Sequence, residues 1–246
     1  MSLRKITLVE GLPFKVPPIE DITDTLPKKQ SWETLPNKKN IVKGVWDKTY
    51  HTGLRKPEDI DTIVVHHSGS PEGTLQAHAG SHSRNWGAGI GYHISIDNGR
   101  IYQVNDLLTF SFHVGDHNTY TVGIEVNRDL SKGDLTSQER ELLYAAILTV
   151  KSLLPIKEIL GHNELNKTAC PCTSMNRIRD DIQLLENKMK QQDTWEAKKT
   201  KVGEIANQYN YMFNLINLGE TDGDAHWAMN QLLAVREVLK ERKLLD

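Results

Sequence analysis

Two histidines and a cysteine give this chain the ligands of a metal site. His162 and Cys170 lie in one short segment, and the pair His66-His67 ends a strand-like run that begins at Thr62. Imidazole nitrogens and a thiolate are ligands that zinc prefers, and three protein ligands leave a fourth position open for water. A structural zinc site needs a fourth ligand and usually closely spaced cysteine pairs, but the chain has only two cysteines. The pattern therefore predicts one catalytic zinc ion per chain.

The residues that must position these groups include several candidate strands. The continuous β-branched run Thr62–His66 is typical of a buried strand, and Thr121–Val126 is a further strand. Gly91–Asp97 and Arg100–Val104 flank the turn Asn98-Gly99. This dipeptide supplies the positive φ angles that a tight hairpin turn requires. The pattern predicts a hairpin in addition to these two strands.

Helical spacing alternates with these strands. Apolar residues recur at helical spacing in Thr74–Trp86 and in Thr136–Leu154, and the second segment opens with a capping box. A short strand, Ile156–Leu160, then leads directly to the candidate ligand His162. Either Thr173 or Ser174 caps another helix. This mixture predicts an α/β fold with a mixed central β-sheet flanked by helices.

Composition divides the chain into three parts. Residues 1–44 hold five of the nine prolines, which block helix propagation, so we expect an extended N-terminal arm. Residues 45–190 contain the alternating strands and helices and are the predicted catalytic domain. Residues 191–246 carry two amphipathic stretches, Trp195–Ile216 and Asp224–Leu239, around a glycine-containing turn. We expect these to form a C-terminal helical hairpin.

Charge and hydropathy exclude several partners. A net charge of -2 does not support a nucleic-acid surface, which would need a concentrated stripe of basic residues. The longest apolar runs fall far short of the roughly 20 residues of a membrane span. Met1–Glu10 lacks the apolar core and cleavage site of a secretory signal. We therefore expect no nucleic-acid partner, no membrane span, and a protein that stays in the cytoplasm until it is released.

Five ordered fragments of this chain resemble one enzyme family. They are Ile63–Ser68, Trp86–His93, Phe112–Gly115 together with Asn118, Val122–Glu125, and Gly161–Pro171. Over roughly Ile60–Ile182 the chain is similar to the zinc-dependent N-acetylmuramoyl-L-alanine amidases of the amidase-2 group, relatives of the peptidoglycan recognition proteins. The resemblance implies a mixed sheet flanked by helices, zinc at one end of an open groove, and bacterial peptidoglycan as the substrate.

The resemblance also assigns the zinc ligands. Carried over by position, they are His66, His162 and Cys170. Neighbouring residues on a strand face opposite sides, so only one of His66 and His67 can point into the groove. We interpret His67, and likewise His93, as structural histidines.

The implied reaction is hydrolysis of the amide bond between N-acetylmuramic acid and L-alanine. Zinc in such sites acidifies water and polarises the scissile carbonyl. Glu125 matches the carboxylate that takes the proton of the attacking water and passes it to the leaving amine. Tyr92 matches a tyrosine that orients the water or stabilises the oxyanion. Thr168 stands where many phage members have lysine, so we expect its hydroxyl to stabilise the oxyanion, with Lys167 as the alternative.

Four further residues are candidates for substrate contact. His113 and Asn118 fall where family members line the groove for sugar and peptide, although a surface loop is the other interpretation of His113. Arg84 and Trp86 are candidates for one wall of that groove, although we favour a place in the core for Trp86. The resemblance does not tell whether lysine or diaminopimelate is preferred in the stem peptide.

Two functions of other classes stand beside the hydrolase. Some relatives bind peptidoglycan without cutting it after losing the cysteine ligand, but Cys170 is present here. A phage structural component could also use such a domain to locate or open the wall. We interpret the chain as an endolysin-like, bacteriolytic amidase of phage or prophage origin. In this interpretation residues 191–246 pack on the main domain, form a homodimer or bind the cell wall.

Overall fold

The computed structural model describes most of the N-terminal three quarters of the chain. The described residues are 2–28, 43, 54–70, 73–86, 89–192, 230, 233–234, 236–237 and 240. The chain divides into two compact units, Met1–Asn187 and Lys188–Asp246. The predicted helical hairpin falls almost wholly outside the described residues, as does the arm beyond residue 28 apart from residue 43. The hairpin and its dimerisation therefore stay predictions.

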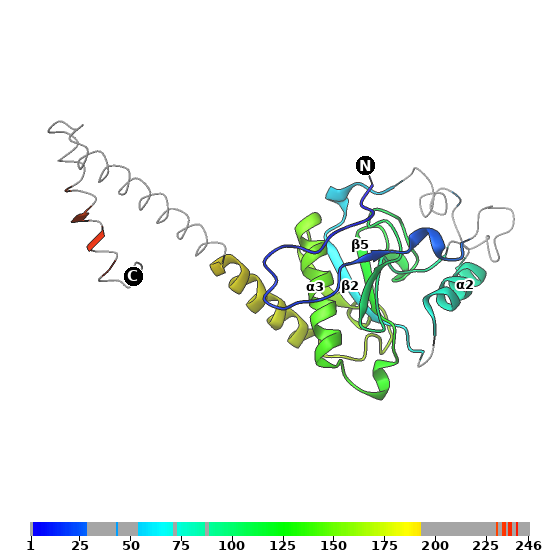
Figure 1. Cartoon of the computed structure of the whole chain (residues 1–246). Coiled ribbons are helices and arrows are strands. Elements are labelled where there is room, and N and C mark those ends of the chain that lie inside the picture. Colours follow the sequence, from blue (N-terminus) through cyan, green and yellow to red (C-terminus); the bar gives the residue numbers. More distant parts are fainter. Residues whose placement is uncertain are drawn as a thin grey trace. The chain divides into compact units, whose positions relative to one another are not determined.

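The first unit is built on a mixed β-sheet (Figure 1). Its strands within the described residues are β1 (Glu20–Asp21), β2 (Thr62–His67), β3 (Ile94–Asp97), β4 (Arg100–Gln103), β5 (Thr121–Val126) and β6 (Glu158–Gly161). Their order across the sheet is β1-β4-β3-β5-β2-β6. Strands β3, β5, β2 and β6 run parallel to one another, whereas β4 is antiparallel to β3 and parallel to β1. The predicted mixed sheet is confirmed.

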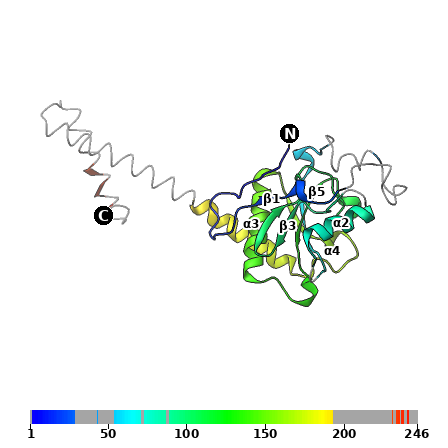
Figure 2. The ribbon, with the colours of Figure 1, turned by 45° about the vertical axis from the view of Figure 1, so that its right-hand side comes forward.

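Helices flank this sheet. They are α2 (Leu75–Trp86), α3 (Ser137–Leu153), α4 (His162–Leu165) and, within the first unit, a helix that begins at residue 175. Short 3-10 turns lie at Thr23–Thr25, Pro57–Asp59, Gly115–His117 and Leu130–Lys132. Helix α3 contacts β3, β4 and β5, and α2 lies on the other side of the sheet (Figures 1 and 2). Thr136 and Glu139 form the predicted capping box of α3. No helix within the described residues is long and apolar enough to cross a membrane.

The core explains why the central strands are so apolar. Both faces of the sheet are covered, so β2 and β5 are buried along almost their whole length. Val64, Val65 and Ile124 are fully buried, and Leu143 and Ile147 of α3 pack in the same core. Strands buried on both faces read as continuous hydrophobic runs, which is the pattern of Thr62–His66.

The hairpin differs slightly from its prediction. Asn98 and Gly99 have φ angles of 46° and 73°, as the tight turn requires. The first strand, however, begins only at Ile94. Gly91 lies instead against the carbonyl of Phe112, which a Cβ atom at Gly91 would meet at 2.5 Å. The chain before β3 therefore follows the neighbouring loop and not a regular strand.

The described part of the N-terminal segment lies along the domain. Within residues 2–28 there is no α-helix, and Glu20–Asp21 adds a short edge strand beside β4. The Ile6 amide donates to Oε1 of Gln103, and the Val9 amide donates to Oγ1 of Thr149. The amide of Ile22 donates to the carbonyl of Gln103. These contacts attach the segment to the sheet edge and to α3.

Candidate metal centre

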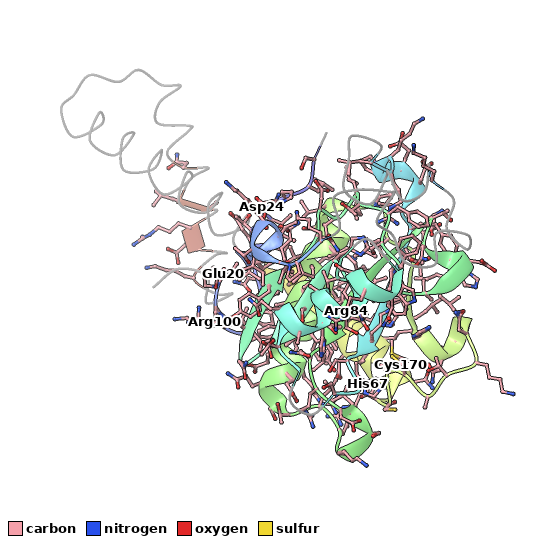
Figure 3. All side chains as sticks on the ribbon, turned by 90° about the vertical axis from the view of Figure 1, so that its right-hand side faces the viewer. Glu20, Asp24, His67, Arg84, Arg100 and Cys170 are labelled. Atoms are coloured by element: carbon pink, nitrogen blue, oxygen red, sulfur yellow. The ribbon has the colours of Figure 1, made fainter. Side chains whose placement is uncertain are left out.

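The candidate site lies at the carboxyl ends of neighbouring parallel strands. Strand β2 ends with His66 and His67, β6 leads directly into His162, and Glu125 stands one residue before the end of β5. Adjacent parallel strands present their carboxyl ends at one edge of the sheet, where open α/β sheets bind ligands. Groups far apart in the sequence therefore meet there. In Figure 3 the labels of Cys170 and His67 stand together at this edge.

His66, His162 and Cys170 form a group that could hold a metal ion. Their ligand atoms all lie within 4.8 Å of one another. Cys170 Sγ is 3.7 Å from His66 Nδ1, and the ring centroids of His66 and His162 are 4.7 Å apart. Sulfur and nitrogen ligands of one tetrahedral zinc ion are about 3.5 Å apart, given the usual zinc–ligand distances. The donor set and the observed spacing therefore both fit zinc.

The cysteine is held in place by its own loop and by β2. The amide of His67 donates to Cys170 Sγ at 3.4 Å, and the amide of Asn163 donates to the Cys170 carbonyl at 2.7 Å. The amide of Cys170 donates to Oγ1 of Thr168. Burial raises the pKa of the Cys170 thiol to about 11. A coordinated cation reverses this effect, because it favours the thiolate.

The two adjacent histidines point to different places, as strand geometry predicts. His66 is 1% exposed, and burial lowers its pKa well below the usual value. His67 Nδ1 instead accepts a hydrogen bond from the Leu130 amide at 3.0 Å and lies 3.9 Å from a carboxylate oxygen of Asp129. His67 thus has structural partners away from the group, whereas His66 faces Cys170 and His162.

Glu125 stands next to His66 across the sheet. The two residues are register partners, and Ser95 of β3 is the partner of Glu125 on its other side. Glu125 is fully buried, and its Oε1 accepts a hydrogen bond from Ser95 Oγ at 2.9 Å. Its Oε2 has no hydrogen-bond partner among the described residues. Burying a carboxylate oxygen without a hydrogen-bond partner is costly, and Oε2 is therefore the atom of Glu125 that is available to a further partner.

The raised pKa of Glu125 predicts how the folding stability of the metal-free protein depends on pH. Burial raises this pKa from 4.5 to about 8, although the Ser95 hydrogen bond opposes the shift. The folded, metal-free protein therefore keeps a proton that the unfolded chain loses above pH 4.5. The resulting stabilisation is full below pH 4.5 and is lost as pH rises through 8. In Glu125→Gln this dependence disappears, so the stability difference between wild type and variant should change by up to about 1.4 kcal/mol per pH unit between pH 5 and 8. Urea unfolding of both metal-free proteins across that range measures it, and parallel profiles would contradict it.

Tyr92 lies beside the same group. Its ring centroid is 5.1 Å from that of His66 and 5.7 Å from that of His82. Burial raises the pKa of its phenol well above 10, and the nearby Glu125 and Cys170 raise it further. The hydroxyl therefore stays protonated at neutral pH and can donate a hydrogen bond.

The predicted oxyanion residues lie on the exposed loop before the cysteine. Thr168 and Lys167 are both exposed. The Thr168 oxygen accepts the amide hydrogen of Cys170, which leaves the hydroxyl hydrogen available to a ligand. Thr168 thus stands next to the metal group through this backbone contact.

The predicted wall residues Arg84 and Trp86 are exposed on α2. Trp86 is 45% exposed, so the favoured interpretation of this residue as core is wrong. Its ring centroid lies 4.8 Å from that of His82, which in turn lies next to Tyr92. His82 thus connects Trp86 to the metal group, and the sequence analysis did not assign it a place in the site.

His113 and Asn118 are placed inside the protein instead of on a groove surface. His113 is 8% exposed, and Asn118 is 3% exposed. The Asn118 Oδ1 accepts hydrogen bonds from the amides of His113 and Val114. His113 Nδ1 lies 3.0 Å from His66 Nε2, behind the metal group. Their predicted contact with substrate stays a prediction.

Two buried residues of the site were missed by sequence reasoning. Ser95 donates to Glu125, and Arg55 donates to backbone carbonyls in the loop that carries His113. A serine inside a strand carries no particular signal. The guanidinium of Arg55 is buried among carbonyls, and burial lowers its pKa to about 9. An isolated arginine in the sequence would more commonly be read as a surface charge.

Comparison with known proteins supplies a family for the central part of the chain. Residues 56–173 match the family described as N-acetylmuramoyl-L-alanine amidase, amidase-2. This range contains all three residues of the metal group together with Glu125 and Tyr92. No curated protein sequence matches the chain.

Several solved structures are similar to this chain. The endolysin amidase LysCS from Clostridium intestinale is 21% identical over 69% of this chain and 97% of its own, with a TM-score of 0.53. The amidase LysC from the same organism is 21% identical over 68% and 99%, also with a TM-score of 0.53. The Ph2119 endolysin from a Thermus scotoductus bacteriophage is 22% identical over 66% and 97%, with a TM-score of 0.48. At such identities the two Clostridium structures show a common fold.

Proposed function

Since residues 56–173 of this chain belong to the amidase-2 family, we propose that the site hydrolyses the amide bond between N-acetylmuramic acid and L-alanine in bacterial peptidoglycan, with one zinc ion as cofactor. The observation that carries this proposal is the group His66, His162 and Cys170 beside a buried carboxylate with an unpaired oxygen. A metal group alone could be structural. The adjacent Glu125 supplies the acid–base group that hydrolysis requires.

The residues divide the work of the reaction. His66, His162 and Cys170 would hold zinc, which polarises the scissile carbonyl and acidifies water when bound. Glu125 takes the proton of the attacking water and delivers it to the leaving amine of L-alanine. Its pKa of about 8 suits this exchange, because a catalytic group works best when its pKa lies near the working pH. The unpaired Oε2 is the oxygen available for it.

Hydrogen-bond donors are available for the negative charge that develops on the carbonyl oxygen. The phenol of Tyr92 is protonated and adjacent to the metal group. The hydroxyl of Thr168 is a second donor, and Lys167 is a cation on the same loop. Such donors contribute most where they are already oriented before the reaction. We assign the main role to Tyr92 and a supporting role to Thr168.

The substrate side of the site is formed by α2. Trp86 offers an exposed aromatic face and Arg84 an exposed cation on the same helix. An aromatic face suits the apolar side of a sugar ring, and a guanidinium suits the carboxylates of a stem peptide. We propose a lytic, endolysin-like role for the protein in a phage or prophage, with release from the cytoplasm before it acts. This lytic role and the release from the cytoplasm rest on the sequence resemblance.

Mass analysis of digested cell walls tests the proposal. Purified peptidoglycan treated with the zinc-loaded protein should release free stem peptides that begin with L-alanine and leave glycan strands with unsubstituted muramic acid. Glycan fragments that keep their side peptides would show that a different bond is cut. Retention of the protein on the wall without any product would identify a peptidoglycan-binding module instead. Wall preparations with lysine or with diaminopimelate in the stem reveal which peptide is preferred.

A further inference from the structure

A chain of hydrogen bonds extends from the metal group into the protein. His66 Nε2 lies 3.0 Å from His113 Nδ1, and His113 Nε2 lies 3.1 Å from Thr121 Oγ1. The Thr121 hydroxyl then donates to the backbone carbonyl of His117 at 2.9 Å. His66, His113 and Thr121 are all buried. Distances alone do not say which nitrogen of each imidazole carries the proton.

The carbonyl at the end of the chain decides its direction. A backbone carbonyl can only accept, so the single hydrogen of the Thr121 hydroxyl goes to His117. His113 Nε2 must then be the donor to Thr121. A buried, neutral imidazole has one N–H, so His113 Nδ1 carries a lone pair and must accept from His66 Nε2. His66 Nδ1 is consequently unprotonated, and this is the atom that lies 3.7 Å from Cys170 Sγ.

We infer that His113 and Thr121 are positioning residues that hold His66 in the tautomer whose Nδ1 lone pair faces the metal group. The inference rests on the metal site of the proposed function. It differs from the sequence prediction, which placed His113 in the substrate groove. The partner of the second imidazole nitrogen commonly fixes the orientation and tautomer of a metal-binding histidine. Here that partner is another histidine, and its own tautomer is set by a threonine.

The surrounding structure is built to receive the His113 ring. A Cβ atom at Gly123 would meet His113 Nδ1 at 2.8 Å and its Cγ at 3.0 Å, so the ring lies directly on the glycine. The Asn118 side chain accepts the His113 amide. Arg55 donates to the carbonyls of Asn118 and Thr121 at 2.9 and 2.6 Å. The loop that carries His113 and the strand that carries Thr121 are therefore held together by one buried guanidinium.

Nitrogen-15 NMR of the metal-free wild-type protein is the first test. The two-bond couplings of each imidazole distinguish the tautomers. We expect His66 and His113 both to carry their proton on Nε2. A proton on His66 Nδ1 would overturn the inference at once. This measurement needs no variant, so it does not depend on whether a substitution folds.

Zinc affinity of three threonine variants is the second test. Thr121→Val removes the hydroxyl at nearly constant shape and should weaken zinc binding by about 10-fold, the lower end of the range for direct partners of metal-binding histidines, because Thr121 acts through His113. Thr121→Ser restores the hydroxyl and should restore the affinity. Thr119→Val, on an exposed threonine of the same segment, is the matched control and should bind zinc like wild type. Competition with a chromogenic chelator measures all three.

The variants should also separate positioning from general loosening. In metal-free Thr121→Val, the His66 tautomers should become mixed, while Thr121→Ser should keep the Nε2 proton. Equal affinity and equal tautomer populations in wild type and Thr121→Val would refute the positioning role. Neither readout uses peptidoglycan. A protein that binds zinc as expected but cuts no wall would therefore disprove the proposed function and leave this inference standing.

Discussion

Replacing Cys170 by serine should weaken zinc binding by at least about 100-fold and reduce wall hydrolysis to background. Zinc sites with four protein ligands bind with apparent free energies of roughly 10–16 kcal/mol, so an equal share for one ligand is roughly 2.5–4 kcal/mol, which is on the order of 100-fold or more in affinity. Cys170 is the sulfur donor of the group and lies 3.7 Å from His66 Nδ1. Serine is nearly isosteric but does not ionise to an anion at neutral pH. Zinc content after dialysis and product release from walls measure the two effects.

The neighbouring cysteine provides a matched control for this prediction. Cys172 lies two residues further on, and its thiol donates to the carbonyl of Ala169, outside the metal group. Cys172→Ser makes the same chemical change in the same loop and should leave zinc content and hydrolysis close to wild type. The opposite pattern, in which Cys172→Ser loses zinc and Cys170→Ser keeps it, would assign the sulfur ligand to Cys172. If both variants retained zinc and turnover, neither cysteine would be a zinc ligand.

The central sheet could be predicted from the sequence because its signals are local. The β-branched run at Thr62 predicts a buried strand, and β2 is observed there. Asn98-Gly99 predicts the hairpin turn, and both residues have positive φ. Strand alternation allows only one of His66 and His67 to face the metal group, and the resemblance selects His66. Each of these inferences needs only a few adjacent residues.

The surroundings of the ligands depend on contacts between distant segments and could not be read locally. His113 lies in a stretch without helical or strand periodicity, so its inward direction follows from Asn118, Gly123 and Arg55. The resemblance assigned His113 to the groove. A resemblance identifies the position of a residue in the sequence, but it does not give the direction of the side chain. Trp86 shows the reverse case. Its aromatic character suits a core, but the end of α2 leaves it 45% exposed.

Glu125 could be placed by resemblance, but its environment could not. Its neighbours across the sheet are His66 on β2 and Ser95 on β3, and both pairings are set by strand register. Register between parallel strands depends on the whole sheet. The single hydrogen bond from Ser95 and the unpaired Oε2 therefore appear only in the folded structure. These two features distinguish the buried Glu125 from a glutamate on a solvated strand face.

Replacing Glu125 by glutamine should reduce turnover by about 10²- to 10⁴-fold while zinc content stays at one per chain. This range is typical for removal of a general acid–base group. The amide keeps the shape of the side chain and can still accept from Ser95, but it can no longer take the proton of water. Glu125 is not among the three candidate ligands, so the metal should stay. Turnover on purified walls and zinc analysis of the same sample measure both quantities.

Two further variants decide whether the acid–base role belongs to Glu125. Glu158→Gln changes an exposed glutamate on β6 and should leave turnover unchanged. Tyr92→Phe removes only the phenol hydroxyl, so a smaller loss, of about 10-fold or more, is expected if it stabilises the oxyanion. If Glu125→Gln retained turnover and Tyr92→Phe were inactive, the acid–base role would belong to Tyr92. Loss of zinc from Glu125→Gln would instead make the carboxylate part of the metal site, because a group acting only on water should leave the three ligand atoms as they are.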